Sequence, residues 1–316
     1  MEKILIIYSY GPTTGLGHYK RSLIIEKELK KKNYVLKLCL DDRKLKKIKF
    51  NKNILKKIRE KKIEKVFLDI NLSTKIAKYD LLNFFDSCKT RNILTIGIDS
   101  LIKYYSKLNY VWLPSPYKPK KIEGNNIIFG WDKLILEKIK KNFKYKKKKS
   151  ILILAGNTKN SFVLKKLPLL ISKYIPEDYK LTWILGKFSV RGDLYLQNNY
   201  KHKIYHNVKS IKKFLSNTGY VFCLYGLSFF ESLSYGIPTS SYVTQKNYKK
   251  DFHEIKYLKK KKIAFIDNNI EKSIKNLQNL IKNDSLSKNF SIRSKKLLSS
   301  VNFEFLNGLK INKNNK

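Results

Sequence analysis

A glycine-rich turn near the start of the chain carries a histidine and an arginine. Gly15, Gly17 and His18 follow the apolar segment 4–8, and Arg21 comes three residues after the histidine. Glycines let a backbone turn sharply and approach a ligand closely, and the first N–H groups of a following helix favour anions. A histidine beside such a ligand can exchange a proton near pH 7. The turn therefore predicts an anion-binding loop with His18 as acid or base, the alternative being a helix-capping loop with an incidental histidine.

A second polar segment, residues 226–238, has the residue types of a nucleotide site. Gly226 and Ser228 open a predicted helix, where N–H and hydroxyl groups can hold phosphate oxygens. Glu231 lies about one turn further on, and its carboxylate can accept both hydroxyls of a ribose or, alternatively, cap its own helix. Gln245 follows the next predicted strand and can bond a sugar or a loop.

Other polar residues stand where predicted strands end. The loop Gly156-Asn157-Thr158 can cradle a diphosphate with its N–H groups, although an ordinary turn explains this loop equally well. Asp69 and Asp99 each end an apolar run, and ligands bind at the carboxyl ends of parallel strands. Asp99 is the stronger candidate because a clean apolar run leads into it, and we expect it to be catalytic together with His18. Helix N-capping is the alternative for both carboxylates.

Two series of alternating strand and helix patterns position these residues. Short, mainly apolar runs, of which 4–8 is fully apolar, predict buried parallel strands over 4–8, 34–40, 66–69, 93–98, 111–113, 151–154, 181–185, 203–205, 220–224 and 239–243. Amphipathic stretches between these runs predict helices. The pattern predicts an α/β protein with two doubly wound domains, residues 1–145 and 150–310, separated by a lysine block. A ligand is then expected in the cleft where the carboxyl ends of the two sheets face each other.

The composition allows two hydrophobic cores but carries a large positive charge. The 316 residues are 42% hydrophobic, and the formal net charge is +44. Only six of the 68 basic residues are arginine, whereas base readers and phosphate clamps favour arginine. We therefore interpret the lysine excess as compositional bias and expect no specific nucleic-acid partner. Attraction to anionic substrates or peripheral contact with a membrane stays open.

The cysteine, histidine and hydropathy patterns indicate the cellular compartment and argue against metal sites and membrane spans. Cys39, Cys88 and Cys223 lack paired spacing and stand beside apolar residues, which predicts buried thiols in a reducing cytoplasm. The histidines and cysteines show no metal-ligand spacing, so we expect no metal and no cofactor. No apolar run reaches the length of a membrane span. These features predict a cytoplasmic protein, which we expect to be a monomer.

The two glycine-bearing segments resemble those of known enzymes. The run from Gly15 to Arg21 resembles the first-loop motif of the UDP-sugar hydrolase of pseudaminic acid biosynthesis and of the spore-coat polysaccharide family. These proteins are akin to the N-acetylglucosaminyl transferase of peptidoglycan synthesis. Residues 226–238 resemble the nucleotide-binding segment that these families share. The resemblance runs in order from about residue 3 to 266, and it implies the glycosyltransferase-B (GT-B) architecture of two Rossmann-like domains.

The resemblance also implies roles for single residues. His18 would be the acid or base at the anomeric carbon, and Gly17 with its neighbouring backbone would line the phosphates. Ser228 would contact the diphosphate and Glu231 the ribose. Asn71 stands where the hydrolase has a tyrosine, so it joins the substrate-binding candidates.

The implied reaction is the metal-independent release of UDP from a UDP-linked amino or deoxy sugar. With water as nucleophile the protein is a nucleotide-sugar hydrolase in nonulosonic acid or surface-polysaccharide synthesis, which is our first hypothesis. With a sugar or lipid hydroxyl as nucleophile it is a glycosyltransferase on the same scaffold. A non-catalytic sensor of nucleotide sugars and a charge-driven nucleic-acid binder are further alternatives.

Overall fold

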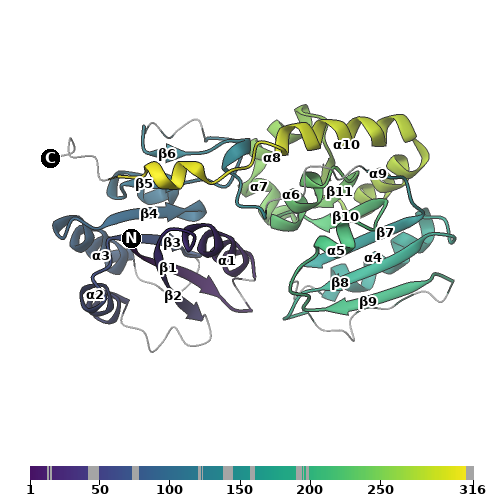
Figure 1. Ribbon diagram of the computed structural model, residues 1–316. Helices are drawn as coiled ribbons and strands as arrows, with labels where there is room; N and C mark the ends of the chain where they lie inside the picture. The colour runs from purple at the N-terminus through teal and green to yellow at the C-terminus, as the bar shows by residue number, and fades with distance from the viewer. Residues whose placement is uncertain are drawn as a thin grey trace. The chain divides into compact units, whose positions relative to one another are not determined.

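The computed structural model describes most of the chain, and the described part divides into two compact units. It does not describe residues 13, 15, 42–49, 73–77, 120, 121, 123, 138–144, 157–160, 190–193, 195, 197, 198 and 311–316. The first unit comprises Met1–Leu136 and the described part of the segment from Val301 onward, and the second comprises Glu137–Ser300. Each unit has its own sheet and its own core, as the sequence predicts (Figure 1).

The first unit contains a six-stranded parallel sheet in the order β2-β1-β3-β4-β5-β6. The strands are β1 (Lys3–Tyr10), β2 (Tyr34–Asp41), β3 (Lys65–Asp69), β4 (Leu94–Ile98), β5 (Tyr110–Trp112) and β6 (Ile127–Ile128). After β1 the chain adds β2 on one side and then crosses to add β3 on the other. The neighbouring strands β1 and β3 thus form a topological switch point, where doubly wound sheets bind ligands.

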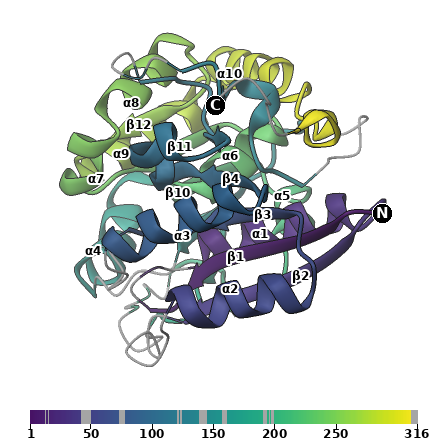
Figure 2. The same cartoon turned by 90° about the vertical axis from the view of Figure 1, so that its left-hand side faces the viewer.

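Helices cover both faces of this sheet, which is why its central strands are mainly apolar. Alternate β1 side chains point to opposite faces: Ile4 and Ile6 pack with α1 (Gly17–Leu29), and Leu5 and Ile7 pack in the cluster formed with α2 (Phe50–Glu60) and α3 (Lys78–Thr90). Figure 2 shows α2 and α3 in front of the sheet and α1 behind it. The 3₁₀ helix η2 (Asp99–Lys107) follows β4, where the sequence shows no regular pattern.

The end of the chain belongs to the first unit, which corrects the predicted second domain of 150–310. Around the 3₁₀ helix η5 (Glu304–Gly308), Phe303, Leu306 and Leu309 are buried in the core of the first unit. The Trp112 ring of β5 makes edge contacts with Phe303 and Phe305, with centroids 6.0 and 5.0 Å apart. Figure 1 shows this yellow segment lying along β5. This segment is too short to show a periodic pattern, so its sequence does not indicate which domain it packs against.

The second unit contains another six-stranded parallel sheet, ordered β12-β11-β10-β7-β8-β9. The strands are β7 (Ser150–Gly156), β8 (Lys180–Leu185), β9 (His202–His206), β10 (Tyr220–Leu224), β11 (Thr239–Tyr242) and β12 (Phe265–Asp267). After β7 the chain adds β8 and β9 on one side and then crosses to β10 on the other. The switch point of this sheet therefore lies between β7 and β10.

Helices of the second unit follow the prediction at five places and depart from it at two. The predicted helices correspond to α4 (Ser161–Tyr174), α5 (Lys212–Leu215), α6 (Leu227–Ser234), α9 (Ile270–Lys282) and α10 (Asp284–Leu298). Sequence patterns did not predict α7 (Gln245–Lys250), α8 (Phe252–Lys260) or the short strand β12. In α8 only Ile255 and Leu258 are buried, so its apolar stripe is weak among many lysines.

Two further observations bear on the predictions from composition. Cys88 and Cys223 are buried as predicted, whereas Cys39 is exposed because its strand, β2, lies at the edge of the sheet. No helix in the described ranges combines the length and the apolar character that a bilayer crossing requires.

Candidate functional site

The switch point of the first unit brings His18 and Asp69 together. His18 is the second residue of α1, which follows β1, and Asp69 is the last residue of β3. The two strands are paired with Tyr8 opposite Asp69, so their carboxyl ends meet at one edge of the sheet. His18 Nδ1 lies 2.6 Å from Asp69 Oδ1, although the residues are 51 positions apart in the chain.

Arg21 clamps the Asp69 carboxylate from the same face of α1. Its Nε and Nη2 donate to Asp69 Oδ2 and Oδ1 at 2.8 and 2.7 Å, a bidentate pair. Its Nη1 reaches Asp99 Oδ2 at 3.2 Å. His18 and Arg21 are three positions apart on a helix, so their side chains leave the same face. The result is a connected group of four residues, which we call the His18 network: His18, Arg21, Asp69 and Asp99.

Burial and charge set the protonation of this network. Burial by itself would raise the pKa of Asp69, but the charges and hydrogen bonds of Arg21 and His18 outweigh it and hold that pKa below its ordinary value. Burial likewise opposes the charge of Arg21, and the carboxylates of Asp69 and Asp99 outweigh it, so the pKa of Arg21 is raised. Asp69 is therefore a carboxylate and Arg21 a cation at neutral pH.

An ionised Asp69 fixes which ring nitrogen of His18 carries the proton. Because the carboxylate can only accept, the 2.6 Å contact is a hydrogen bond donated by His18 Nδ1–H. In the neutral ring Nε2 is then the acceptor, and the assignment rests on this hydrogen-bond network. The His18 side chain is 13% exposed, so the ring is held by its surroundings yet reachable. The arrangement can take a proton from a hydroxyl group or from water.

Hydrogen bonds between loops stiffen the same edge of the sheet. The N–H of Asn71 donates to Ser9 Oγ at 3.0 Å, which links the segment after β3 to β1. Ser100 Oγ donates to the carbonyl of Ile70 at 2.6 Å, which links η2 to the same segment. Asn71, a predicted substrate-binding residue, is half-buried at this edge, two residues beyond Asp69.

Gly17, another predicted binding residue, begins α1. A Cβ placed on Gly17 would meet no other atom of the described residues within 4 Å, so these residues leave this side of the helix start open. No side chain caps the start of α1, and its first turn contains no acidic residue. Its first N–H groups can therefore serve an anion. Gly15, which the sequence placed beside Gly17 in this loop, lies outside the described residues.

The second unit places Gly156 and Gly226 at its own switch point. Gly156 ends β7, and Gly226 follows the neighbouring strand β10. Both have left-handed backbones, with φ of 66° and 150°, which side chains strain. A Cβ on Gly156 would lie 3.6 Å from Leu224 Cδ1, which shows how closely the two strand ends approach. Asn157 and Thr158, also predicted to bind substrate, lie outside the described residues.

Helix α6 presents its start at this switch point. No side chain caps it and its first turn contains no acidic residue. Ser228 is its second residue, and Glu231, one turn on, has its Oε2 atom buried. Gln245 begins α7 beyond β11, where its Oε1 accepts from Asn268 Nδ2 at 2.5 Å. The structure thus gathers Gly156, Gly226 and the start of α6, whereas Gln245 lies beyond the next strand.

Comparisons with known proteins identify the architecture. No protein-family model matches the sequence, and no curated protein matches it. MurG from Acinetobacter baumannii superposes with a TM-score of 0.62 at 13% identity, over 94% of this chain and 95% of that chain. The spinosyn rhamnosyltransferase SpnG, also solved with thymidine diphosphate, gives 0.65 at 10% identity, over 95% and 96%. The chain has the GT-B fold.

The GT-B fold is shared by more than one kind of reaction. A putative UDP-N-acetylglucosamine 2-epimerase from Listeria monocytogenes superposes with a TM-score of 0.55 at 12% identity, over 94% of this chain and 92% of that chain. Fold similarity at such identities shows the architecture and leaves the chemistry to the site itself. Within the described residues, no group of three or more histidine, cysteine, aspartate or glutamate side chains has the geometry of a metal site.

The strand order shows why Asp69, rather than the higher-ranked candidate Asp99, contacts His18. Asp99 follows β4, which is two strands from β1, and it reaches the His18 network only through Arg21. Asp69 ends β3, the strand beside β1, and it contacts His18 directly. The signal that could have found Asp69 is the strand order, because the switch point selects the strand that neighbours β1.

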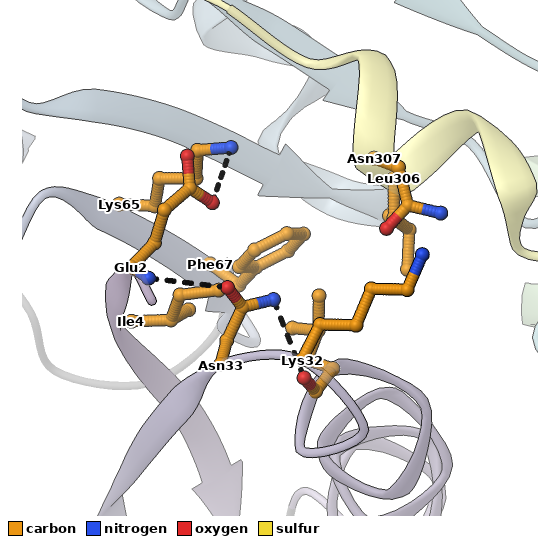
Figure 3. Close-up of a pocket in the computed structure, with 9 residues that line it drawn as sticks. Glu2, Ile4, Lys32, Asn33, Lys65, Phe67, Leu306 and Asn307 are labelled. Atoms are coloured by element: carbon orange, nitrogen blue, oxygen red, sulfur yellow. Dashed lines mark hydrogen bonds and ion pairs between the residues drawn. The ribbon is translucent and has the colours of Figure 1, made fainter.

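A hollow of about 270 Å³ lies at the other end of the same sheet (Figure 3). Glu2, Lys65 and Asn33 line it, and Lys65 Nζ lies 2.8 Å from a Glu2 carboxylate oxygen. Glu2 precedes β1, whereas His18 follows it, and a strand of eight residues spans about 25 Å. This hollow is therefore separate from the His18 network.

Proposed function

We propose that the protein is a glycosyltransferase that moves a sugar from a nucleoside diphosphate to an acceptor hydroxyl, with His18 as the base. The observation that carries the proposal is the 2.6 Å contact of His18 Nδ1 with a buried, ionised Asp69, because it leaves Nε2 to accept a proton. Arg21 supports the pair by holding both oxygens of the carboxylate. GT-B neighbours that are named glycosyltransferases favour transfer over the other chemistries of this fold.

The proposed reaction needs one proton acceptor and one stabilised leaving group. The acceptor O–H gives its proton to Nε2 as its oxygen bonds to the anomeric carbon, and the bond from that carbon to the diphosphate oxygen breaks. The imidazolium that forms is neutralised by Asp69, and the nucleoside diphosphate leaves with the electron pair. Asp69 is a positioning residue in this scheme, because it acts through His18.

The second unit supplies features suited to the leaving diphosphate. The uncapped start of α6 and the left-handed backbone of Gly226 offer N–H groups to anionic oxygens, with Ser228 beside them. Such donors can carry the developing charge without a metal, so we propose a metal-independent reaction. Glu231 is the proposed partner of the ribose hydroxyls. Neighbours solved with thymidine diphosphate or a UDP-sugar support a nucleoside diphosphate donor of either base.

A direct assay tests the proposal and separates it from hydrolysis, which the resemblance of the Gly15–Arg21 run favours. The protein is incubated with UDP- and TDP-linked sugars in EDTA, with and without a mixture of sugar and lipid acceptors, and released nucleotide is measured. We expect release that depends on an acceptor. Release without any acceptor would replace the transferase by a hydrolase, and failure to bind either nucleoside diphosphate would overturn both.

Gly17→Ala is expected to weaken donor use without weakening the fold. The added methyl group meets open space in the protein, and alanine favours a helix over glycine by about 0.5–1 kcal/mol. A diphosphate bound against this helix start would collide with that methyl group. We therefore expect an unchanged or higher melting temperature and a donor KM raised about tenfold, measured by thermal unfolding and nucleotide release. Unchanged donor kinetics would contradict a phosphate site at this turn.

A further inference from the structure

Asp99 has a backbone conformation that its place in the fold does not explain. Among the described residues, five that are not glycine have positive φ, close to the left-handed helical region: Lys62, Asn92, Asp99, Asn207 and Lys262. Asp99 has φ of 57° and stands directly after β4, at the start of η2. Aspartate adopts this conformation more readily than most L-residues, as Asn207 does after β9, but the conformation still needs a local reason.

Three of the other four residues do have such a reason, because they terminate helices. After α2 the N–H of Ile63 bonds the carbonyl of Ile58 at 3.0 Å, with Lys62 in the left-handed position. After α3 the N–H of Ile93 bonds the carbonyl of Cys88 at 2.9 Å, with Asn92 in the equivalent place. Lys262 follows α8. These are ordinary helix ends, whereas no helix ends at Asp99.

The side chain of Asp99 is the accessible carboxylate of the His18 network. It is 43% exposed, whereas the Asp69 side chain is completely buried. Its Oδ2 contacts Arg21 Nη1 at 3.2 Å, and its other oxygen has no partner among the residues that the structure describes. Ser100 anchors the adjacent backbone through its bond to Ile70. A strained backbone therefore presents a carboxylate oxygen, open to a ligand, within reach of the guanidinium that also holds Asp69.

The charge of the network limits what can bind there. Asp69 and Asp99 contribute two negative charges and Arg21 one positive charge, so the network is net negative while His18 is neutral. A group beside Asp99 must donate a hydrogen bond and carry no negative charge. Hydroxyl and ammonium groups meet both conditions, whereas a carboxylate would be repelled by Asp99.

We propose that Asp99 binds a hydroxyl or ammonium group of the acceptor next to His18, and so selects neutral or amino sugars over acidic ones. This inference rests on the proposed function, because it names the acceptor class of the same site. On this proposal, the left-handed backbone of Asp99 orients its carboxylate toward the acceptor.

The test compares three variants with the wild type. Asp99→Asn removes the charge while asparagine tolerates the left-handed backbone, and Asp99→Gly keeps the turn without any side chain. Asp86→Asn is the matched control, because it removes an equally charged side chain from the same unit, 58% exposed and 3.6 Å from Lys107. The probes are glucosamine, glucose and glucuronate, each added at tens of millimolar to thermal unfolding and to the nucleotide-release assay.

We expect glucosamine to raise the melting temperature of the wild type and of Asp86→Asn by a degree or more, and glucuronate to raise neither. Asp99→Asn and Asp99→Gly should lose this rise and should use glucosamine about tenfold less well as an acceptor, chiefly through KM. Equal shifts in all four proteins, or no shift in the wild type, would overturn the proposal. If no protein releases nucleotide but the pattern of shifts appears, the proposed function fails and Asp99 remains a sugar-binding residue.

Discussion

His18→Ala is expected to lower the rate of sugar transfer by about 10²–10⁴-fold, the range typical of a lost general base. The reason is the tautomer that Asp69 imposes: only Nε2 can take the acceptor proton, and alanine offers no replacement. Nucleoside diphosphate binding should be unchanged, because the groups assigned to the diphosphate, at the start of α6 and at the Gly17 turn, do not include the His18 side chain. The measurements are steady-state nucleotide release for the rate and calorimetry for nucleoside diphosphate binding.

His253→Ala is the matched control for this variant. His253 is exposed on α8 of the second unit, so its replacement removes an imidazole side chain that does not belong to the His18 network. It should retain the wild-type rate. Wild-type transfer by His18→Ala would contradict the assignment of His18 as the base.

Asp69→Asn is expected to lower the free energy of unfolding by about 3 kcal/mol, because it leaves the buried Arg21 charge without its main partner. Activity should fall as well, since an asparagine amide can donate to His18 Nδ1 and so favour the tautomer with the proton on Nε2. Asp86→Asn, which breaks an exposed ion pair, should cost no more than about 1 kcal/mol. Urea unfolding of the three proteins measures these differences.

The Asp69→Asn difference should depend on pH in a definite direction. The pKa of Asp69 is lower in the folded protein than in the unfolded chain, where it is about 4. Its ionisation therefore stabilises the fold fully above that value, and the contribution is lost as the pH falls further. The stability gap between wild type and Asp69→Asn should be constant from about pH 5 to 8 and shrink below about pH 4. A gap that persists unchanged in acid would contradict the assignment of Asp69 as the ionised partner.

Most strands and helices could be predicted because their signals are local. Runs such as Ile4 to Tyr8 are apolar without interruption, and the structure confirms them as strands buried on both faces. The elements that escaped prediction have little local signal: β6 has two residues, and α8 buries two side chains among many lysines. Where a helix or strand is held mainly by its neighbours, its own sequence shows little periodicity.

The candidate site divides in the same way. The glycines at 156 and 226 were predictable because a left-handed backbone after a strand is a local demand, and His18 because it stands at the helix start after a glycine-bearing loop. The pairing of His18 with Asp69 was not, since two aspartates end predicted strands and only the strand order distinguishes them. Arg21 was predicted to bind substrate from the loop, but it lies on α1, and its role as a clamp depends on which carboxylate lies opposite.

What the sequence determined by itself is therefore the series of strands, helices and strand-end loops, because periodicity and glycine act over a few neighbouring residues. The tertiary structure alone decided which strand lies beside β1, that Asp69 rather than Asp99 meets His18, and that residues 301–310 return to the first unit. Those outcomes depend on contacts between residues dozens to hundreds of positions apart. Such contacts are selected by the packing of whole faces against one another, which no short stretch of sequence encodes.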